Sequence, residues 1–182
     1  FEDKILLAVL TDDAVSLDQQ LSAKQEAIHN KYTLQCTFTP LIDASLLHLC
    51  AEYNHTACAY ILLKHGVDIN TKAGLDEHGF GGQSPIFHTV NQHNNNSNEM
   101  LELLLSHGAD LTLTVKGLIW GKGYDWETFI PSVNPISYAM MGLLLQFQRK
   151  EEQIYEVVSL LQKARYGSEY KPGNVPNRYL NM

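Results

Sequence analysis

Residues Gly117–Gly123 come closest in this chain to a loop that could bind phosphate. Glycine backbone N–H groups and the ammonium of Lys122 are the groups that hold phosphate oxygens in such loops. The segment is one residue short between its glycines, and Lys122 is followed by Gly123 where a serine or threonine is needed. It then leads into Tyr-Asp-Trp-Glu, which does not resemble the start of a helix. The sequence therefore indicates no nucleotide site at this position.

Eight histidines and three cysteines could in principle supply metal ligands. His88 and His93 are five residues apart with turn-forming residues between them, so we do not expect them to share a face. Cys36, Cys50 and Cys58 form no CxxC pair, which argues against a zinc ribbon and a disulfide framework. No nucleophile in the sequence has an evident base partner. We predict a chain that is not an enzyme, binds no metal and needs no cofactor.

Composition narrows the classes of partner further. Of the 182 residues 45% are hydrophobic, enough to build a core, and the formal net charge is −7. An acidic chain without a block of lysines and arginines is a poor binder of nucleic acid. Its longest apolar run, Ala139–Leu145, is too short to span a membrane. We expect neither nucleic acid nor a membrane as partner. Sparse cysteines are typical of the reducing cytoplasm, and a start at Phe1 predicts a fragment or a processed product.

A two-part pattern of apolar stretches recurs along the chain. Three segments begin alike, and each is followed by a second apolar stretch: Ser45–Tyr53, Ser84–Gln92 and Asn134–Met141. Ser84-Pro85 and Asn134-Pro135 are typical helix starts, with a capping side chain and a proline in the first turn. Gly66 and Gly108 stand where helices end. Such short helices are not stable alone in water, so the pairs must stack on one another.

These segments resemble the ankyrin repeat, with its head Thr-Pro-Leu-His-x-Ala and its tail Leu-Leu-x-x-Gly-Ala-Asp-x-Asn. The segment Ser45–Asn70 keeps Leu-His, Ala and Gly-Val-Asp-Ile-Asn, and Ser84–Thr112 keeps Ser-Pro-Ile and Gly-Ala-Asp-Leu-Thr. The resemblance implies an all-α fold, an ankyrin-repeat α-solenoid of about four helix pairs with β-turn or hairpin finger insertions. It also implies that the ring of His48 bonds backbone groups of the adjoining repeat. We expect a repeat domain over residues 2–167, with units at about 2–24, 45–70, 84–112 and 134–167, and an extended tail at 168–182.

The terminal units depart from the pattern. We expect a first helix pair within Lys4–Ala23, turning at Asp12-Asp13. The last pair is expected to have a long first helix, from Pro135 to about Lys150, before Ile154–Arg165 returns. End repeats commonly differ because one face meets solvent instead of a neighbour.

The loops between the units are longer than in the family, and we call residues 25–44, 71–83 and 113–133 fingers one, two and three. Long loops grouped on one face of a solenoid are usually functional. In finger three, Leu111–Val115 alternates as a strand does. Four aromatic residues follow within ten positions, and we expect Trp126 and Phe129 to point inward with Trp120 and Tyr124 outward.

Aromatic residues of this kind dominate binding hot spots, although these rings could instead form a small core of their own. In finger two, Phe80 between glycines is either an anchor for a partner or part of a flexible spacer. Family analogy adds groove positions on and beside the first helix of each pair: Ala44, Glu52, Tyr53, Gln83, Asn91, Gln92, Val133 and Met141. The candidate partner-binding residues are therefore Trp120, Tyr124, Trp126, Phe80, Glu52, Tyr53, Asn91, Gln92 and Met141.

The resemblance implies a non-enzymatic module that binds another protein through its concave groove and its fingers, as a monomer or a weak oligomer. Degenerate repeats with loops rich in Asn, Gln and Lys resemble bacterial members of the family, which suggests a scaffold in a bacterial cell. The alternative is an immunity protein or inhibitor that blocks a specific enzyme or toxin with its acidic surface. A ligand-binding or hydrolytic role would need a pocket between finger three and the last helix.

Overall fold

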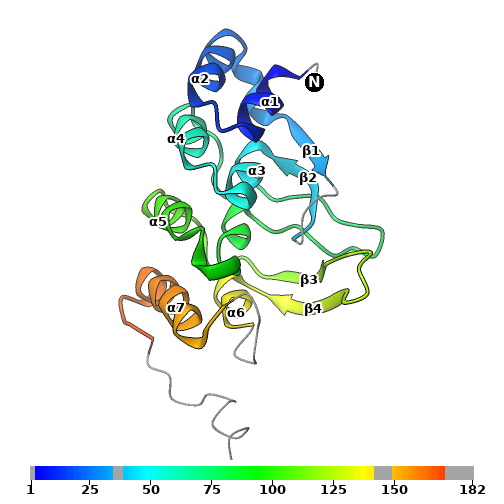
Figure 1. The fold of residues 1–182 in the computed structure, drawn as a ribbon, viewed down its shortest axis with the longest axis vertical. Helices are drawn as coiled ribbons and strands as arrows, with labels where there is room; N and C mark the ends of the chain where they lie inside the picture. The colour runs from blue at the N-terminus through cyan, green and yellow to red at the C-terminus, as the bar shows by residue number, and fades with distance from the viewer. Residues whose placement is uncertain (1–2, 35–38, 142–148, 171–182) are drawn as a thin grey trace, which may run out of the picture.

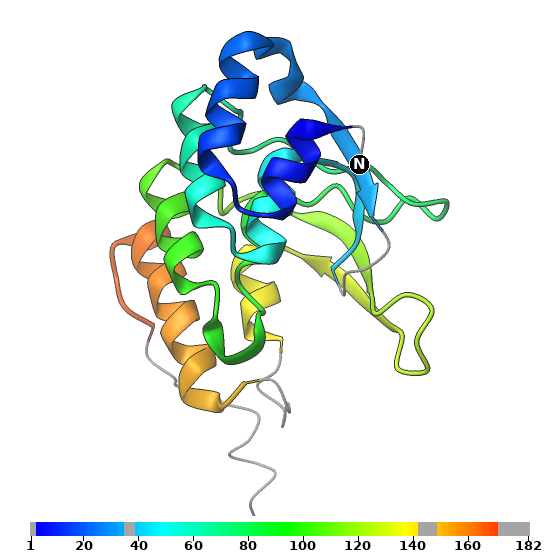
Figure 2. The ribbon, with the colours of Figure 1, turned by 45° about the horizontal axis from the view of Figure 1, so that its top comes forward.

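In the computed structural model, which describes residues 3–34, 39–141 and 149–170, helices stack in two layers beside a row of fingers (Figure 1). The inner layer, next to the fingers, contains α1 (Lys4–Leu10), α3 (Leu46–Tyr53), the 3₁₀ turn η2 (Pro85–His88) and α6 (Pro135–Met140). The outer layer contains α2 (Ala14–Ala23), α4 (Thr56–Lys64), α5 (Asn98–Ser106) and α7 (Glu151–Tyr166). Turned by 45°, the molecule shows the fingers extending away from both helix layers (Figure 2).

The helices are held by their neighbours along the stack. Helix α1 packs on α2 and α3, α3 packs on α4 and η2, and α6 packs on α7 and η2. One continuous core runs from Ile5 to Leu161 through fully buried leucines such as Leu47, Leu62 and Leu104. Each buried leucine contributes about 1.5–3 kcal/mol relative to an exposed one. The structure is therefore a helical repeat solenoid, and among the described residues no helix is long and apolar enough to cross a membrane.

The first residues of successive repeats cap their helices with different side-chain hydrogen bonds. In α3 the ring of His48 accepts a hydrogen bond at Nδ1 from the Ser45 backbone N–H (3.2 Å) and lies 2.8 Å from the Ser45 hydroxyl oxygen. Because a backbone N–H can only donate, Nε2 carries the proton and donates to the carbonyl of Gln83 at 2.9 Å. The expected bond from His48 to the adjoining repeat is confirmed. In α6, Asn134 and Ser137 cap each other reciprocally instead.

The head between these two is shifted by one residue. Phe87 stands three residues after Ser84, where His48 stands after Ser45, and His88 follows it. The hydroxyl of Ser84 is buried and has no hydrogen-bond partner among the described residues. This head forms only the 3₁₀ turn η2 rather than an α-helix, and side chains also donate hydrogen bonds to its carbonyls. Thr89 donates to Ile86 O at 2.8 Å and Gln92 donates to His88 O at 2.8 Å.

The long helix expected from Pro135 to Lys150 is wrong. Helix α6 ends at Met140, and Met141 has extended backbone angles. The guanidinium of Arg149 donates to the carbonyls of Val90 (2.9 Å), Ala139 (3.1 Å) and Met141 (3.3 Å), and so caps the end of the helix. Part of the expected helix, residues 142–148, and residues 171–182 of the expected tail lie outside the described residues.

The fingers contain two small antiparallel sheets, so the fold is not purely α, and the expected hairpin insertions are present. After the 3₁₀ turn η1 (Gln25–His29), β1 (Lys31–Leu34) pairs with β2 (Leu41–Ser45) in finger one. In finger three, β3 (Val115–Trp120) pairs with β4 (Thr128–Val133).

The strand expected over Leu111–Val115 is wrong, because β3 begins only at Val115. In the residues before β3, polar side chains accept hydrogen bonds from backbone N–H groups. Asn70 of the preceding repeat accepts from the Asp110 N–H at 2.7 Å, and Asp110 accepts from the Thr112 N–H at 2.7 Å. The short 3₁₀ turn η3 (His93–Asn95) precedes α5 and completes the elements.

Candidate protein-binding surface

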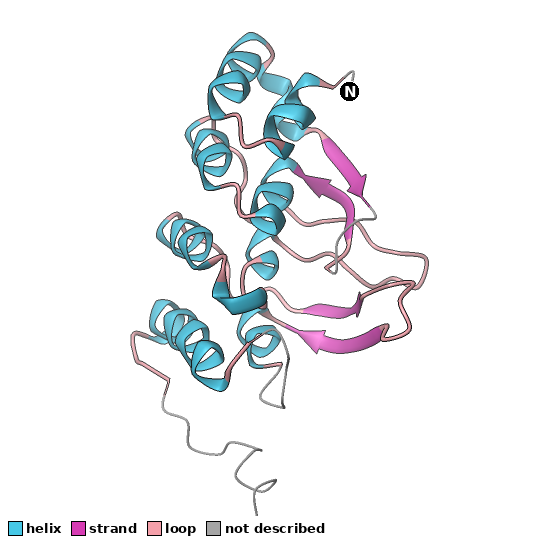
Figure 3. Ribbon diagram, viewed as in Figure 1, coloured by secondary structure: helices cyan, strands magenta, loops and turns pink. Residues whose placement is uncertain are grey.

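The three fingers are joined edge to edge by backbone hydrogen bonds. Gly74 of finger two donates to Ile42 of β2 at 2.7 Å, and Gly81 of finger two donates to Gly117 of β3 at 2.9 Å. Finger two closes on itself through the bond from Ala73 N–H to Gln83 O at 2.9 Å. Finger two thus lies between the two hairpins (Figure 3). We call this hydrogen-bonded arrangement of fingers one to three the finger layer.

Close approach of the backbones depends on glycine at Gly81. Its φ of +115° is one that other residues rarely adopt, and a Cβ added there would lie 2.6 Å from the carbonyl oxygen of Gly74. A side chain at this position would push the two arms of finger two apart. The glycines that the sequence offers as a flexible spacer therefore serve a tight contact.

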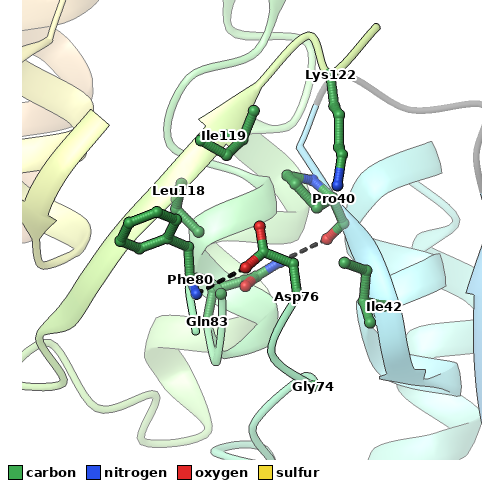
Figure 4. A pocket seen from close by; sticks show the side chains of 10 residues that line it. Pro40, Ile42, Gly74, Asp76, Phe80, Gln83, Leu118, Ile119 and Lys122 are labelled. Atoms are coloured by element: carbon green, nitrogen blue, oxygen red, sulfur yellow. Dashed lines mark hydrogen bonds between the residues drawn. The ribbon is translucent and has the colours of Figure 1, made fainter. Parts of the chain in front are cut away.

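The hollow between the fingers is too small for a ligand. It is lined by residues of all three fingers, including Ile42, Asp76, Phe80 and Leu118, and Figure 4 shows these side chains converging on it. Its volume of about 10 Å³ is room for about one water, whereas small-molecule sites measure hundreds of Å³. Hydrogen bonds also close it: Gln83 Nε2 donates to Pro40 O at 2.5 Å and Phe80 N–H donates to Asp76 Oδ1 at 2.9 Å.

The β3–β4 hairpin separates the aromatic residues of finger three onto two faces. Leu118 is paired with Ile130, and both side chains are buried on the inner face. Because side chains alternate along a strand, Phe129 lies on the opposite face, opposite Ile119. There Phe129 packs on the ring of Phe80, with centroids 4.8 Å apart. Phe80 is thus part of a pair between fingers two and three, not an isolated loop tip.

The remaining three aromatic residues form a cluster at the end of the hairpin, which we call the tip cluster: Trp120, Tyr124 and Trp126. The rings of Tyr124 and Trp126 are stacked, with centroids 4.9 Å apart and planes at 18°. Trp120 meets Trp126 edge-on at 5.2 Å. Gly121 allows this packing, because a Cβ there would lie 2.0 Å from the Trp126 ring, and its φ is +64°.

The expected orientations of these rings are partly wrong. Trp126 and Phe129 were expected to point inward, but they are 43% and 49% exposed. Trp120 was expected outward, but it is half-buried against the core. Only Tyr124, 53% exposed, lies as expected. The physical reason is register: Trp120 continues the inner face of β3, and the turn that follows carries Trp126 outside it.

Carboxylates outnumber cations around the finger tips. The ammonium of Lys122 attracts the carboxylates of Glu77, Asp76 and Glu127, and Asp125 stands two residues before Glu127 in the chain. Glu77 accepts a hydrogen bond from Lys122 at 2.8 Å, which lowers the pKa of Glu77 and raises the pKa of Lys122. Glu127 accepts from the Gly123 N–H at 2.8 Å, which fixes its carboxylate beside the tip cluster.

The candidate groove residues are not all accessible. Ala44, Gln83 and Val133 are buried, so the structure removes them from the accessible surface. The Glu52 carboxylate is also largely buried and accepts a hydrogen bond from His88 Nδ1 at 2.7 Å, joining α3 to η2. Its role here is to hold two repeats together.

The other candidate groove residues remain half-exposed. The ring of Tyr53 lies 5.8 Å from that of His55. Asn91 and Gln92 follow η2, and Gln92 caps its last turn. Met141 follows α6, and its carbonyl accepts from Arg149. Tyr53 is the last residue of α3 and the other three follow η2 or α6, so none belongs to the hairpin that carries the tip cluster.

The hydrogen bond of His48 was expected from the family resemblance, but its strongly lowered pKa and the buried Arg149 were not. Burial lowers the pKa of the His48 imidazole to about 3, so that this ring stays neutral. Burial also lowers the pKa of Arg149 to about 10, so its guanidinium stays charged at neutral pH. The sequence signal for Arg149 is weak, since it stands four residues after the apolar run Ala139–Leu145 and is followed by Lys150. Within the described residues no three His, Cys, Asp or Glu side chains are placed to hold a metal ion.

Comparison with known proteins agrees with the architecture. A family model described as ankyrin repeats (3 copies) matches residues 9–115. A search of curated proteins finds no match. The matched region begins near the end of α1 and ends at the first residue of β3, so it spans α2, the next two helix pairs and 107 of the 182 residues. This chain belongs to the ankyrin repeat family.

Proposed function

We propose that this chain is a non-enzymatic module that binds a partner protein through its finger layer, with the tip cluster of Trp120, Tyr124 and Trp126 as the main contact. Ankyrin repeats generally mediate protein–protein interaction. The observation that carries the proposal is the exposure of two stacked aromatic rings, Tyr124 and Trp126, on a support fixed by hydrogen bonds.

Physical reasoning supports this surface over the rest of the molecule. Tyrosine and tryptophan offer a large contact area at low cost in side-chain entropy, and they are enriched in binding hot spots. A surface that is already ordered before binding loses less entropy when a partner arrives. The tip cluster satisfies both conditions, because its rings are mutually packed and finger three is bonded to finger two.

The helices contribute a second, more polar part of the proposed surface. Four half-exposed residues lie at or just after the ends of the inner helical elements: Tyr53, Asn91, Gln92 and Met141. We propose that they line the edge of the contact, while Glu52 holds the underlying repeats in place through His88. Phe80 supports the layer from its packing on Phe129.

An inhibitor of a specific enzyme or toxin is the second candidate. The excess of carboxylates around the finger tips favours it, because such a surface complements a basic active site. An inhibitor and a scaffold would use the same surface and differ in the partner.

A photocrosslinking experiment tests the proposal in the native cell. Tyr124 and Tyr60 are similarly exposed, at 53% and 58%, but Tyr60 lies on the outer helix α4. Each is replaced in turn by p-benzoylphenylalanine, and the cells are irradiated. We expect one discrete crosslinked protein from position 124 and none from position 60. Equal crosslinking from both positions, or none from position 124, would refute the proposed surface.

A further inference from the structure

The surroundings of the tip cluster carry information about the chemistry of its partner. Asp125 is exposed between the two stacked rings in the sequence, and Glu127 is held at the same turn by Gly123. Lys122, the single cation among the finger-tip residues, is engaged by Glu77 of finger two. Asp76 and Glu127 also attract the same ammonium, so three carboxylates share one cation and, together with Asp125, leave net negative charge at this turn.

Aromatic rings and carboxylates together favour one kind of side chain. A guanidinium or ammonium is attracted to the face of a tryptophan or tyrosine ring, and it also pairs with carboxylates. An acidic partner would place like charge against Asp125 and Glu127. A purely apolar partner would remove water from these carboxylates without supplying a counter-ion. The charge pattern therefore discriminates between classes of partner segment.

We infer that the tip cluster receives an arginine- or lysine-bearing segment of the partner protein, with a cationic side chain over the Tyr124–Trp126 stack and beside Asp125 and Glu127. This inference rests on the proposed function and specifies the partner as basic at the point of contact. The net charge of −7 favours the approach of such a partner at long range.

The two tryptophans provide a reporter for this site alone. The chain contains two tryptophans, and both belong to the tip cluster, so tryptophan emission reports directly on occupancy there. The probe is a short synthetic peptide of alternating glycine and arginine, titrated at physiological salt. The comparison peptide carries citrulline in place of arginine, which keeps the shape and removes the charge. We expect a saturable change in emission with the arginine peptide and at least fivefold weaker binding of the citrulline peptide.

Variants that remove carboxylate charge test whether the arginine peptide binds beside Asp125 and Glu127. Asp125→Asn with Glu127→Gln should weaken binding of the arginine peptide about three- to tenfold, since exposed charge contacts are individually modest. The glutamine still accepts from Gly123, so the turn is preserved. Glu99→Gln with Glu102→Gln removes the same charge from exposed positions on the outer helix α5 and should change binding less than twofold.

Either of two results with the peptides would overturn the inference. One is an equal response to the arginine and citrulline peptides, and the other is an equal loss of binding in the two double variants. If the photocrosslink from position 124 persists and is unaffected by Asp125→Asn with Glu127→Gln, the proposed function stands and the basic segment is refuted. Loss of the crosslink itself refutes the proposed function first.

Discussion

Lowering the pH should destabilise this protein through a single buried imidazole. In the folded chain His48 is fully buried, and its pKa falls from the ordinary 6.5 to about 3. Burial is the main cause, and the neighbouring His88 ring, 5.6 Å away, adds to it. Between these two pKa values the unfolded chain binds a proton at this position that the folded chain does not. The free energy of unfolding therefore falls as the pH falls from about 6.5 to about 3.

The size of the effect follows from the pKa difference. Going from about pH 7.5 to about pH 5, the contribution of His48 amounts to about 2 kcal/mol of lost stability. His48→Gln removes the titrating group, while the glutamine amide can still donate to Gln83 O and accept from Ser45. The variant is less stable at pH 7.5, but its loss of stability on acidification should be smaller than that of the wild type by this amount.

Urea unfolding followed by far-ultraviolet circular dichroism measures both proteins across this pH range. The quantity compared is the change in unfolding free energy with pH, which is insensitive to a constant offset between variants. The matched control is His78→Gln, which removes an exposed histidine from finger two and should retain the wild-type slope. Parallel curves for the wild type and His48→Gln would show that the reasoning about His48 is mistaken.

Four further substitutions test particular contacts. Gly121→Ala should lower stability by about 2 kcal/mol and change tryptophan emission, because a Cβ with positive φ meets the Trp126 ring. Arg149→Met should lower the free energy of unfolding in urea by about 2 kcal/mol or more, since buried carbonyls lose a charged donor. Ser84→Ala should change stability by less than about 0.5 kcal/mol, whereas Ser45→Ala, at the equivalent position of the preceding head, should cost about 1–2 kcal/mol.

The controls for these substitutions come from the same chain. Gly123→Ala also has a positive φ, of +86°, but meets nothing within 4 Å, so it should cost less than Gly121→Ala and leave the emission unchanged. Arg149→Lys keeps the charge with fewer donors and should fall between the wild type and Arg149→Met. A Ser84→Ala variant as unstable as Ser45→Ala would contradict the bonding described for the two heads.

The repeat architecture was predictable because its signals are local. The acidic caps of α1 and α2 (Asp3 and Asp13) and the left-handed glycines Gly66 and Gly108 act within one helical turn. Element ends that depend on distant residues were missed. Helix α6 stops where Arg149, eight or more residues further along the chain, takes up its carbonyls. The helix periodicity of Pro135–Lys150 contains no trace of that contact.

In the candidate site, too, features set by local sequence were predictable and features set by distant residues were not. The crowding of Trp120, Tyr124 and Trp126 is visible in the sequence, but which ring faces solvent depends on strand register, which the β3–β4 pairing sets. The link between fingers two and three joins Gly81 to Gly117, far apart in the chain and without side chains to suggest a contact. Long-range backbone pairing between irregular loops leaves no periodic pattern to detect.

The finger layer also limits which sequence changes are tolerated in ankyrin repeat proteins whose loops are bonded in this way. In a solenoid with independent loops, insertions and deletions alter recognition one loop at a time. Here finger two is bonded to β2 on one side and β3 on the other, so a length change in it would shift the register of both neighbours. Variation that preserves folding is therefore confined to substitutions at exposed positions such as Tyr124 and Asp125. A combinatorial library built on this chain should randomise side chains at the turn and keep every loop length fixed.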